Sequence, residues 1–171
     1  VLEMATMFSE YIIENGEPER TLRFCTWGGE EEGLWGSTAY VDEMNQDLAM
    51  NLRLYVNLDM NHVDIDQSRS DSVTLFANHP EDYGHIERLA EEYKVANPQM
   101  ASKYTINLGL YDGAKGDSDG MPCNSDHCPF VYDLDGGDTV GRAAVCYGSG
   151  SWEYHTYLDD LTRFNEESLG I

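Results

Sequence analysis

Long apolar runs are missing from this sequence. No stretch of the 171 residues approaches the roughly 20 consecutive apolar residues that a membrane-spanning helix requires, so we expect no membrane span. The chain also starts without an initiator methionine or a basic segment, and no signal peptide is visible. With 41% hydrophobic and 25% charged residues, the composition is typical of one globular domain that buries a core.

Positive charge is scarce. Thirty-two acidic residues face 10 basic ones, of which three are lysines, and the formal net charge is -22. Such a chain repels phosphate backbones, so we expect no nucleic-acid partner. An acidic, lysine-poor surface suits concentrated salt, where screening removes self-repulsion. A halophilic source and an ordinary acidic enzyme both remain open.

Cysteine is also sparse, with four residues in the chain. Cys25 and Cys146 lie in apolar, strand-like runs and are interpreted as buried thiols. Cys123 and Cys128 bracket an Asn-Ser-Asp-His segment. Their spacing leaves a zinc site, a local disulfide and unbridged thiols open, although structural zinc sites usually have two closer pairs. The redox compartment therefore stays open.

Apolar periodicity predicts strands that alternate with helices. We expect strands at 21–27, 52–60, 73–77 and 143–147, and helices at 1–14, 36–44, 83–96 and 158–169. Asn15-Gly16-Glu17-Pro18 ends the first helix, and a Gly/Asp/Ser-rich loop occupies 111–124. This order predicts an α/β fold, a three-layer α/β/α sandwich with a mostly parallel mixed sheet. The apolar run at 52–60 predicts a central strand.

Three consecutive carboxylates follow the first predicted strand. Glu30-Glu31-Glu32 lie between glycines at the end of that strand. Adjacent carboxylates in such a position can have two different functions. One can bind a divalent metal while its neighbour takes a proton from water. A solvated turn is the alternative interpretation of a bare glutamate triplet.

Two further polar residues also follow strands. Asp59 ends an apolar strand, where a carboxylate is costly to bury unless it is paired or bound to metal. His155 follows the glycine-rich loop after the last predicted strand, and imidazole is a common zinc ligand. Taken singly, a capping or turn aspartate is the alternative interpretation of Asp59, and a surface or core histidine is the more ordinary interpretation of His155.

Four ordered motifs together resemble the co-catalytic zinc aminopeptidase family. They are Trp-Gly-Gly-Glu-Glu-Glu-Gly-Leu-Trp-Gly-Ser, then Asn-Leu-Asp-Met, Ser-Asp-His-Cys-Pro-Phe, and Tyr-His-Thr with Asp-Asp-Leu behind it. That family includes secreted bacterial aminopeptidases, glutamate carboxypeptidases, glutaminyl cyclases and the transferrin receptor. The resemblance covers essentially the whole chain.

The resemblance implies a role for each matching residue. Glu30 matches the general base that activates water and then protonates the leaving amine. Glu31 and His155 match ligands of one zinc ion, and Asp59 matches a ligand of the other. Tyr154 matches a tyrosine that helps to hold the oxyanion in some relatives.

The remaining motif residues have smaller implied roles. Asp126 and His127 belong to a motif that supports the site, and Glu32 receives no role. Asn124 stands where some relatives have a basic residue, so their carboxylate-side contacts are not carried over.

The chain also departs from the family pattern. The family's His-x-Asp pair and its bridging aspartate would both lie upstream of Val1, and His62-Val63-Asp64 comes too late to replace them. We therefore expect an N-terminally truncated fold, with residues 1–171 forming the C-terminal portion of a single zinc peptidase catalytic domain. A natural, metal-free binding domain is the competing explanation. The retained base and ligands favour the fragment, which by itself would hold zinc weakly and lack activity.

The predicted function is a metallo-aminopeptidase that hydrolyses the N-terminal bond of peptides through a zinc-activated water. The resemblance implies two zinc ions as cofactor in the complete enzyme and a peptide as substrate. Further partners would be the missing N-terminal portion or another chain. A carboxypeptidase, a glutaminyl cyclase and a metal-free interaction domain are the alternatives. Family resemblance favours a secreted or periplasmic location.

Overall fold

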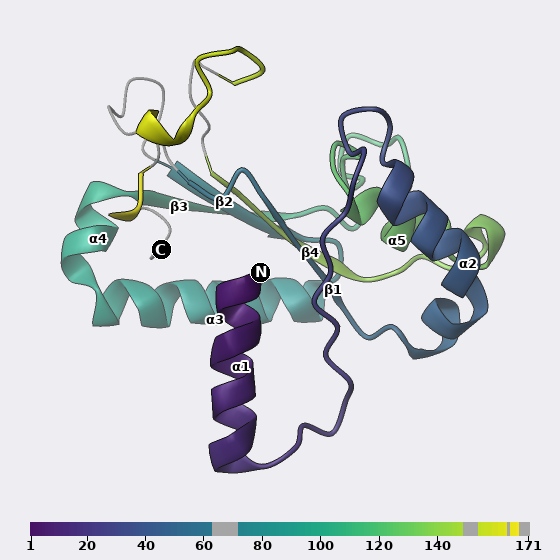
Figure 1. The fold of residues 1–171 in the computed structure, drawn as a ribbon, viewed down its shortest axis with the longest axis horizontal. Helices are drawn as coiled ribbons and strands as arrows, with labels where there is room; N and C mark the ends of the chain where they lie inside the picture. The colour runs from purple at the N-terminus through teal and green to yellow at the C-terminus, as the bar shows by residue number, and fades with distance from the viewer. Residues whose placement is uncertain (63–71, 149–153, 164, 168–171) are drawn as a thin grey trace.

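The structure is a computed structural model that describes residues 1–62, 72–148, 154–163 and 165–167 (Figure 1). Its helices are α1 (Leu2–Asn15), α2 (Trp35–Asn51), α3 (Pro80–Ala96), α4 (Pro98–Lys103), α5 (His127–Tyr132) and the 3-10 turns η1 (Leu134–Gly137) and η2 (Leu161–Arg163). Its strands are β1 (Tyr55–Asp59), β2 (Ser72–Ala77), β3 (Thr105–Leu110) and β4 (Ala143–Gly148). Among the described residues, no helix is long and apolar enough to cross a bilayer.

The four strands form one mixed sheet in the order β1-β4-β2-β3. The pairs β1/β4 and β2/β3 are parallel, and β2 runs antiparallel to β4. Asp59 lies opposite Tyr147 where both β1 and β4 end. Two of the three strand pairs are therefore parallel, which confirms the predicted mostly parallel mixed sheet.

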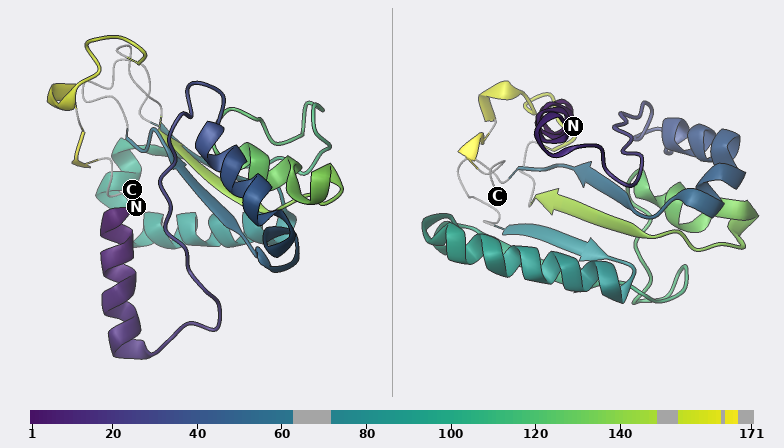
Figure 2. Two further views of the ribbon diagram at one scale, coloured as in Figure 1. Left: turned by 45° about the vertical axis from the view of Figure 1, so that its right-hand side comes forward. Right: turned by 90° about the horizontal axis from the view of Figure 1, so that it is seen from below.

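Helices cover both faces of this sheet (Figure 2). Side chains alternate between the faces of a strand, so neighbouring positions identify the two layers. On one face, Phe76, Ala143 and Val145 pack against Val131 and Tyr132 of α5. On the other face lie Val73, Leu75 and Cys146, in contact with Met100 of α4 and with Tyr104. The helix α3 also contacts β2 and β3. The predicted three-layer α/β/α arrangement is confirmed.

The strand β1 lies at an edge of the sheet, so the prediction of a central strand was wrong. Its Tyr55, Asn57 and Asp59 face the α5 layer, whereas Val56 and Leu58 on the other face are 53% and 37% exposed. The apolar run suggested burial on both faces. In the described part of the chain, however, helices cover that second face only over the other half of the sheet.

Two predicted elements differ from the structure. The segment 21–27 belongs to no strand, because a strand requires a hydrogen-bonding neighbour and this segment contacts α2 through side chains. There, Arg23 Nη1 donates to the Tyr40 hydroxyl over 2.7 Å. The closing helix expected at 158–169 is reduced, within the described residues, to the single turn η2. The six-residue elements β3, α4 and α5 were not predicted.

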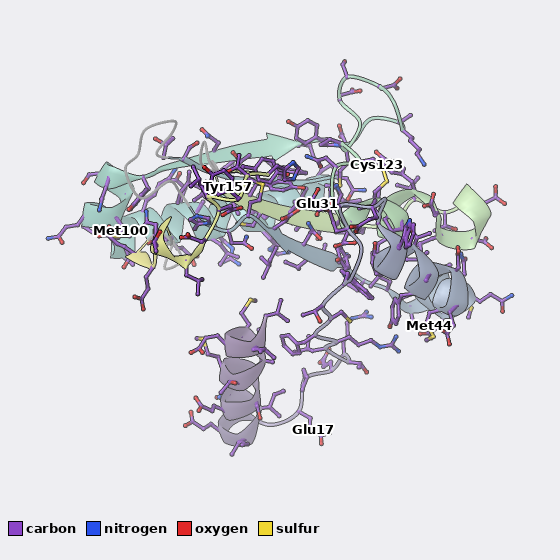
Figure 3. All side chains as sticks on the ribbon, turned by 45° about the horizontal axis from the view of Figure 1, so that its top comes forward. Glu17, Glu31, Met44, Met100, Cys123 and Tyr157 are labelled. Carbon is purple, nitrogen blue, oxygen red and sulfur yellow. A yellow bond between two sulfur atoms is a disulfide. The ribbon has the colours of Figure 1, made fainter. Side chains whose placement is uncertain are left out.

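The helix α1 projects from the rest of the molecule, and none of its residues is buried (Figures 1 and 3). It ends as the sequence predicts. Gly16 adopts a φ of 92°, a left-handed conformation that glycine tolerates, and its N–H donates to Ile12 O.

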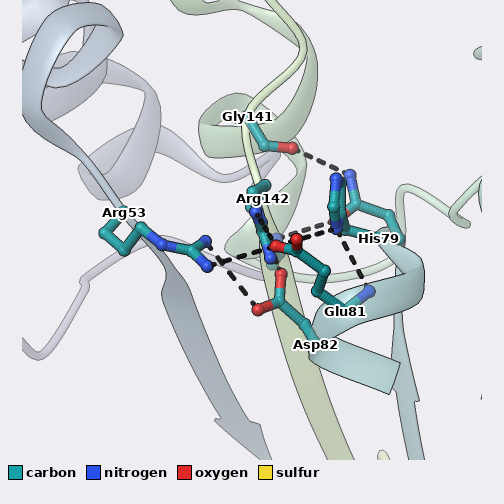
Figure 4. Close-up of polar contacts among 8 residues, drawn as sticks. Arg53, His79, Glu81, Asp82, Gly141 and Arg142 are labelled. Atoms are coloured by element: carbon teal, nitrogen blue, oxygen red, sulfur yellow. Dashed lines mark hydrogen bonds and ion pairs between the residues drawn. The ribbon is translucent and has the colours of Figure 1, made fainter. Parts of the chain in front are cut away.

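A charged cluster joins the start of α3 to the start of β4 (Figure 4). Arg142 Nε donates to Asp82 Oδ2 over 2.6 Å, and its Nη1 donates to Glu81 Oε2 over 3.0 Å. The Asp82 side chain is only 5% exposed, whereas that of Glu81 is 66% exposed. This cluster lies at the end of β4 opposite to Asp59, and we interpret it as structural.

Candidate active site

The glutamate motif forms a tight turn at the start of α2. The amides of Gly33 and Leu34 both donate to Glu30 O, and the amide of Gly36 donates to Gly28 O. Gly29 has a φ of 71°, and a Cβ atom added to Gly36 would lie 2.8 Å from Gly28 O. The glycines therefore let the chain fold back on the helix, which holds Glu30 and Glu31 on a fixed turn.

The second carboxylate comes from the end of β1. Asp59 Oδ2 accepts a hydrogen bond from Ser125 Oγ over 2.7 Å. The next residue, Met60, has a φ of 50°, which is uncommon for a residue other than glycine. The chain thus turns sharply after the strand and leaves Asp59 at the edge where β1 and β4 both end.

His155 reaches the glutamate turn from the far end of the chain. Its Nε2 lies 2.7 Å from Glu31 Oε1, and its backbone adopts a φ of 60°. The ring of Tyr154 stacks on the imidazole, with 3.8 Å between the ring centroids. A left-handed histidine is a strained conformation of the kind that gathers at functional sites. Both side chains of the His155–Glu31 pair are more than half exposed.

Charges of the predicted residues act on Glu30 and on Tyr154. Burial raises the pKa of Glu30, and the carboxylates of Glu31 and Asp59 raise it further, while His155 lowers it. Burial likewise raises the pKa of Tyr154, and the same three carboxylates add to that rise. The assignment of these residues to one site, and their individual roles in it, stay predictions.

The donor set fits a divalent metal by its chemistry. Carboxylates that repel one another lie beside an imidazole, and a bound cation would offset the repulsion. Glu31 and His155 already lie within hydrogen-bond distance of each other, as two ligands of one ion must be close. Among the described residues, no three His, Cys, Asp or Glu side chains form a ready cluster that could hold a metal. The described residues therefore include two or three potential donors and no complete metal site.

The Ser-Asp-His segment is buried next to this region and hydrogen-bonds to α2 and to Asp59. Ser37 Oγ of α2 donates to Asp126 Oδ1 over 2.5 Å, and both side chains are buried. His127 is fully buried, and its Nε2 lies 2.6 Å from Pro122 O, so that nitrogen carries the proton. Its Nδ1 has no hydrogen-bond partner among the described residues. The supporting role of Asp126 and His127 stays a prediction.

Sequence reasoning missed three residues that contact the site. Ser125 binds Asp59, Asn57 donates to Ser125 over 3.0 Å, and Tyr147 lies opposite Asp59 in the sheet. Burial raises the pKa of Tyr147 to about 12, and the charges of Asp59 and Glu30 contribute. One signal was present, since a buried asparagine in an apolar strand requires a partner.

The two cysteines that flank this segment form a disulfide, Cys123–Cys128 (Figure 3). Their sulfur atoms are bonded to each other, so a zinc site between them is excluded. Cys25 and Cys146 are free and half-buried, close to the expected buried thiols, and burial raises the pKa of Cys146.

The sequence profile of peptidase family M28 matches residues 1–171. The chain belongs to this family. The family match agrees with the predicted resemblance to co-catalytic zinc aminopeptidases, and it covers all the segments that meet at the site.

Individual relatives are distant members of the family. The chain is 26% identical to a probable glutamate carboxypeptidase of Arabidopsis thaliana over 95% of its length, and 25% identical to the probable leucine aminopeptidase 2 of Aspergillus oryzae over 99%. An aminopeptidase of Pseudomonas aeruginosa is 27% identical over 99% of the chain. The matched regions span only 22%, 34% and 31% of these three relatives. No solved structure gives a significant match.

Proposed function

We propose that this M28 chain is part of a zinc-dependent exopeptidase that hydrolyses the N-terminal bond of peptides. One observation carries the proposal. Glu31 and His155, 124 positions apart in sequence, approach to 2.7 Å beside Glu30, whose pKa responds to both and to Asp59. A general base next to potential metal ligands is the arrangement that metal-assisted hydrolysis requires.

Three residues would hold metal in this proposal. Glu31 and His155 would bind one zinc ion, and Asp59 would bind the second. When bound, the ions would supply Lewis-acid polarisation of the scissile carbonyl and would make water more acidic. The incomplete ligand set is consistent with residues 1–171 being one portion of a catalytic domain, whose other donors belong to further protein.

Glu30 would move the proton. Its carboxylate would accept a proton from the attacking water and pass it to the nitrogen of the leaving amine. Burial and like charge keep its pKa above the ordinary value for glutamate, which brings it closer to a neutral working pH. The Tyr154 hydroxyl, whose pKa is also raised, would stay protonated and donate to the carbonyl oxygen as negative charge develops.

A carboxypeptidase is the second candidate, because relatives of similar identity are named both aminopeptidase and glutamate carboxypeptidase. Glutaminyl cyclisation and metal-free binding are further alternatives on the same fold. The Cys123–Cys128 disulfide supports a secreted or periplasmic location, since disulfides persist in oxidising compartments. The exposed Val56 and Leu58 support a covering segment, either of the same protein or of another chain.

Substrate profiling of the full-length protein tests the proposal. We expect zinc-dependent hydrolysis of leucyl-p-nitroanilide and little activity on a peptide with a free C-terminal glutamate and a blocked N-terminus. Glu30→Gln should lower kcat by about 10²–10⁴-fold, whereas the neighbouring Glu32→Gln should retain activity. Equal activity of the two variants, or hydrolysis confined to the blocked peptide, would reject the aminopeptidase assignment.

A further inference from the structure

The segment that carries Tyr154 and His155 lies mostly exposed on the surface. Within 154–162 and 165–167, where the structure describes burial, only Asn165 is buried. The helical turn in this segment, η2, has three residues. A segment that buries so little apolar surface gains little order from the hydrophobic effect. Its position, and with it the position of His155, therefore depends on specific polar contacts.

Polar contacts attach the end of this segment to α4 and to Tyr104, the residue that follows α4. The Tyr104 hydroxyl donates to Glu167 Oε2 over 3.0 Å, and Asn165 Nδ2 donates to that hydroxyl over 3.4 Å. Lys103, the last residue of α4, also donates to Glu167 Oε2. Hydrogen bonds from Lys103 and from Tyr104 lower the pKa of Glu167, so its carboxylate is ionised at neutral pH. We call these four residues the C-terminal anchor.

The fixed side of the anchor belongs to the hydrophobic core. Tyr104 is 3% exposed and packs with Val73 of β2 and Met100 of α4. Its amide donates to Met100 O, where α4 ends and β3 begins. Close packing leaves a buried ring few alternative positions, so the hydroxyl points in a fixed direction. Its acceptor is charged, and such hydrogen bonds are stronger than those between neutral groups.

The segment is therefore attached at two places. At its start, His155 Nε2 lies 2.7 Å from Glu31 Oε1, and at its end the anchor binds Glu167. The side chains of His155 and Glu31 are 56% and 60% exposed, and an exposed pair of this kind contributes little by itself. The anchor shortens the free length of chain, which raises the effective concentration of His155 near Glu31.

We propose that Tyr104 and Glu167 are positioning residues, which tether the C-terminal segment to the core and thereby hold His155 beside Glu31 for metal binding. This inference rests on the proposed function, because it takes Glu31 and His155 as ligands of one metal ion. The apparent affinity of a site falls with the fraction of molecules in which its ligands are assembled. The anchor raises that fraction before a metal ion binds.

Zinc affinity of the full-length protein, measured by competition with a chelator, tests this role without relying on catalysis. We expect Glu167→Ala and Tyr104→Phe each to bind zinc about 10-fold more weakly, since a hydrogen bond to a charged group contributes a factor of that order. Glu167→Gln, whose amide oxygen still accepts from Tyr104, should recover part of the loss. The double variant Tyr104→Phe/Glu167→Ala should bind zinc no more weakly than Glu167→Ala, because both changes remove the same hydrogen bond.

Cross-linking tests the position of the segment in the absence of metal. On oxidation of the metal-free protein, Glu31→Cys/His155→Cys should form a disulfide, and the addition of Glu167→Ala should slow its formation by about 10-fold. Glu91→Ala is the matched control for both measurements. It removes another exposed carboxylate that binds a lysine, Lys94 on α3, and should change neither the zinc affinity nor the rate of cross-linking.

The two measurements separate the anchor from the peptidase function. Wild-type zinc affinity in Glu167→Ala, or an unchanged rate of cross-linking, would overturn the inference and leave the function intact. If Glu167→Ala weakens zinc binding and slows cross-linking but the wild type hydrolyses no peptide, the function is rejected and the positioning role is retained. Glu167 and Glu91 are both exposed, so neither substitution leaves a cavity that would prevent folding.

Discussion

His155 Nε2 lies 2.7 Å from Glu31 Oε1, so the C-terminal part of the chain reaches the turn that precedes α2. In the described structure this contact is a hydrogen bond or ion pair between exposed side chains, and such pairs contribute little to stability. The strained backbone of His155 therefore requires another explanation. In the proposed function, shared binding of one metal ion would supply it.

Removal of His155 should impair metal binding. We expect His155→Gln to lower zinc affinity by more than about 100-fold, since loss of a direct ligand exceeds the effect of outer partners. His85→Gln is the control, because His85 is exposed on α3. Chelator competition on the full-length protein measures both. Similar affinities in the two variants would remove His155 from the proposed ligand set.

Neutralising Asp82 should destabilise the fold. Asp82→Asn leaves the partly buried Arg142 without its closest negative charge. We expect the free energy of unfolding to fall by about 2–3 kcal/mol. This is less than for a fully buried ion pair, because the Arg142 side chain is 23% exposed. Glu81→Gln is the matched control, since exposed Glu81 binds the same guanidinium and should change stability little. Urea denaturation measures both variants, and equal midpoints would contradict a structural role specific to Asp82.

Stability should fall in mild acid because of His127. Burial lowers the pKa of His127, although the Pro122 carbonyl and the carboxylates of Asp59 and Asp126 act in the opposite direction. Below about pH 6.5 the unfolded chain therefore binds a proton that the folded chain resists. The stabilisation that the folded protein gains from a neutral His127 is complete above that pH. It is lost as the pH falls toward the lower folded pKa, by up to about 1.4 kcal/mol per pH unit.

His127→Gln should reduce this pH dependence. Its side-chain amide keeps an N–H for Pro122 O but does not titrate, so the variant should show a shallower loss of unfolding free energy between pH 7 and pH 5. Urea denaturation of both proteins across that range measures the difference. Identical slopes would show that His127 does not control the transition.

The disulfide should be detectable and stabilising. Thiol titration of the unfolded, unreduced chain should find two free cysteines, Cys25 and Cys146, and reduction should raise the count to four. Closing the short loop between Cys123 and Cys128 lowers the entropy of the unfolded chain, which raises the free energy of unfolding by about 2 kcal/mol. A Cys123→Ser/Cys128→Ser variant should lose a similar amount in urea denaturation, and four free thiols before reduction would disprove the pairing.

Local signals predicted the three longest helices, α1, α2 and α3, whose hydrogen bonds close within one segment. The helix α1 ends at Gly16, and the Gly28–Gly29 turn presents its glutamates, because glycine conformation and helix geometry are set by neighbouring residues. The segment 21–27 has an equally strong strand pattern but forms no strand. Its backbone groups need a second segment to pair with, and an amino-acid pattern does not specify that segment.

The sequence by itself determined the family and the α/β class, and it named the candidate residues Glu30, Glu31, Asp59, Tyr154 and His155, because these follow from residue identity and spacing. Only the tertiary structure decided that β1 lies at an edge, that β2 opposes β4, and that Cys123 pairs with Cys128. It also supplied the bond from Ser125 to Asp59. These contacts join residues through space, and their partners depend on packing that no local pattern encodes.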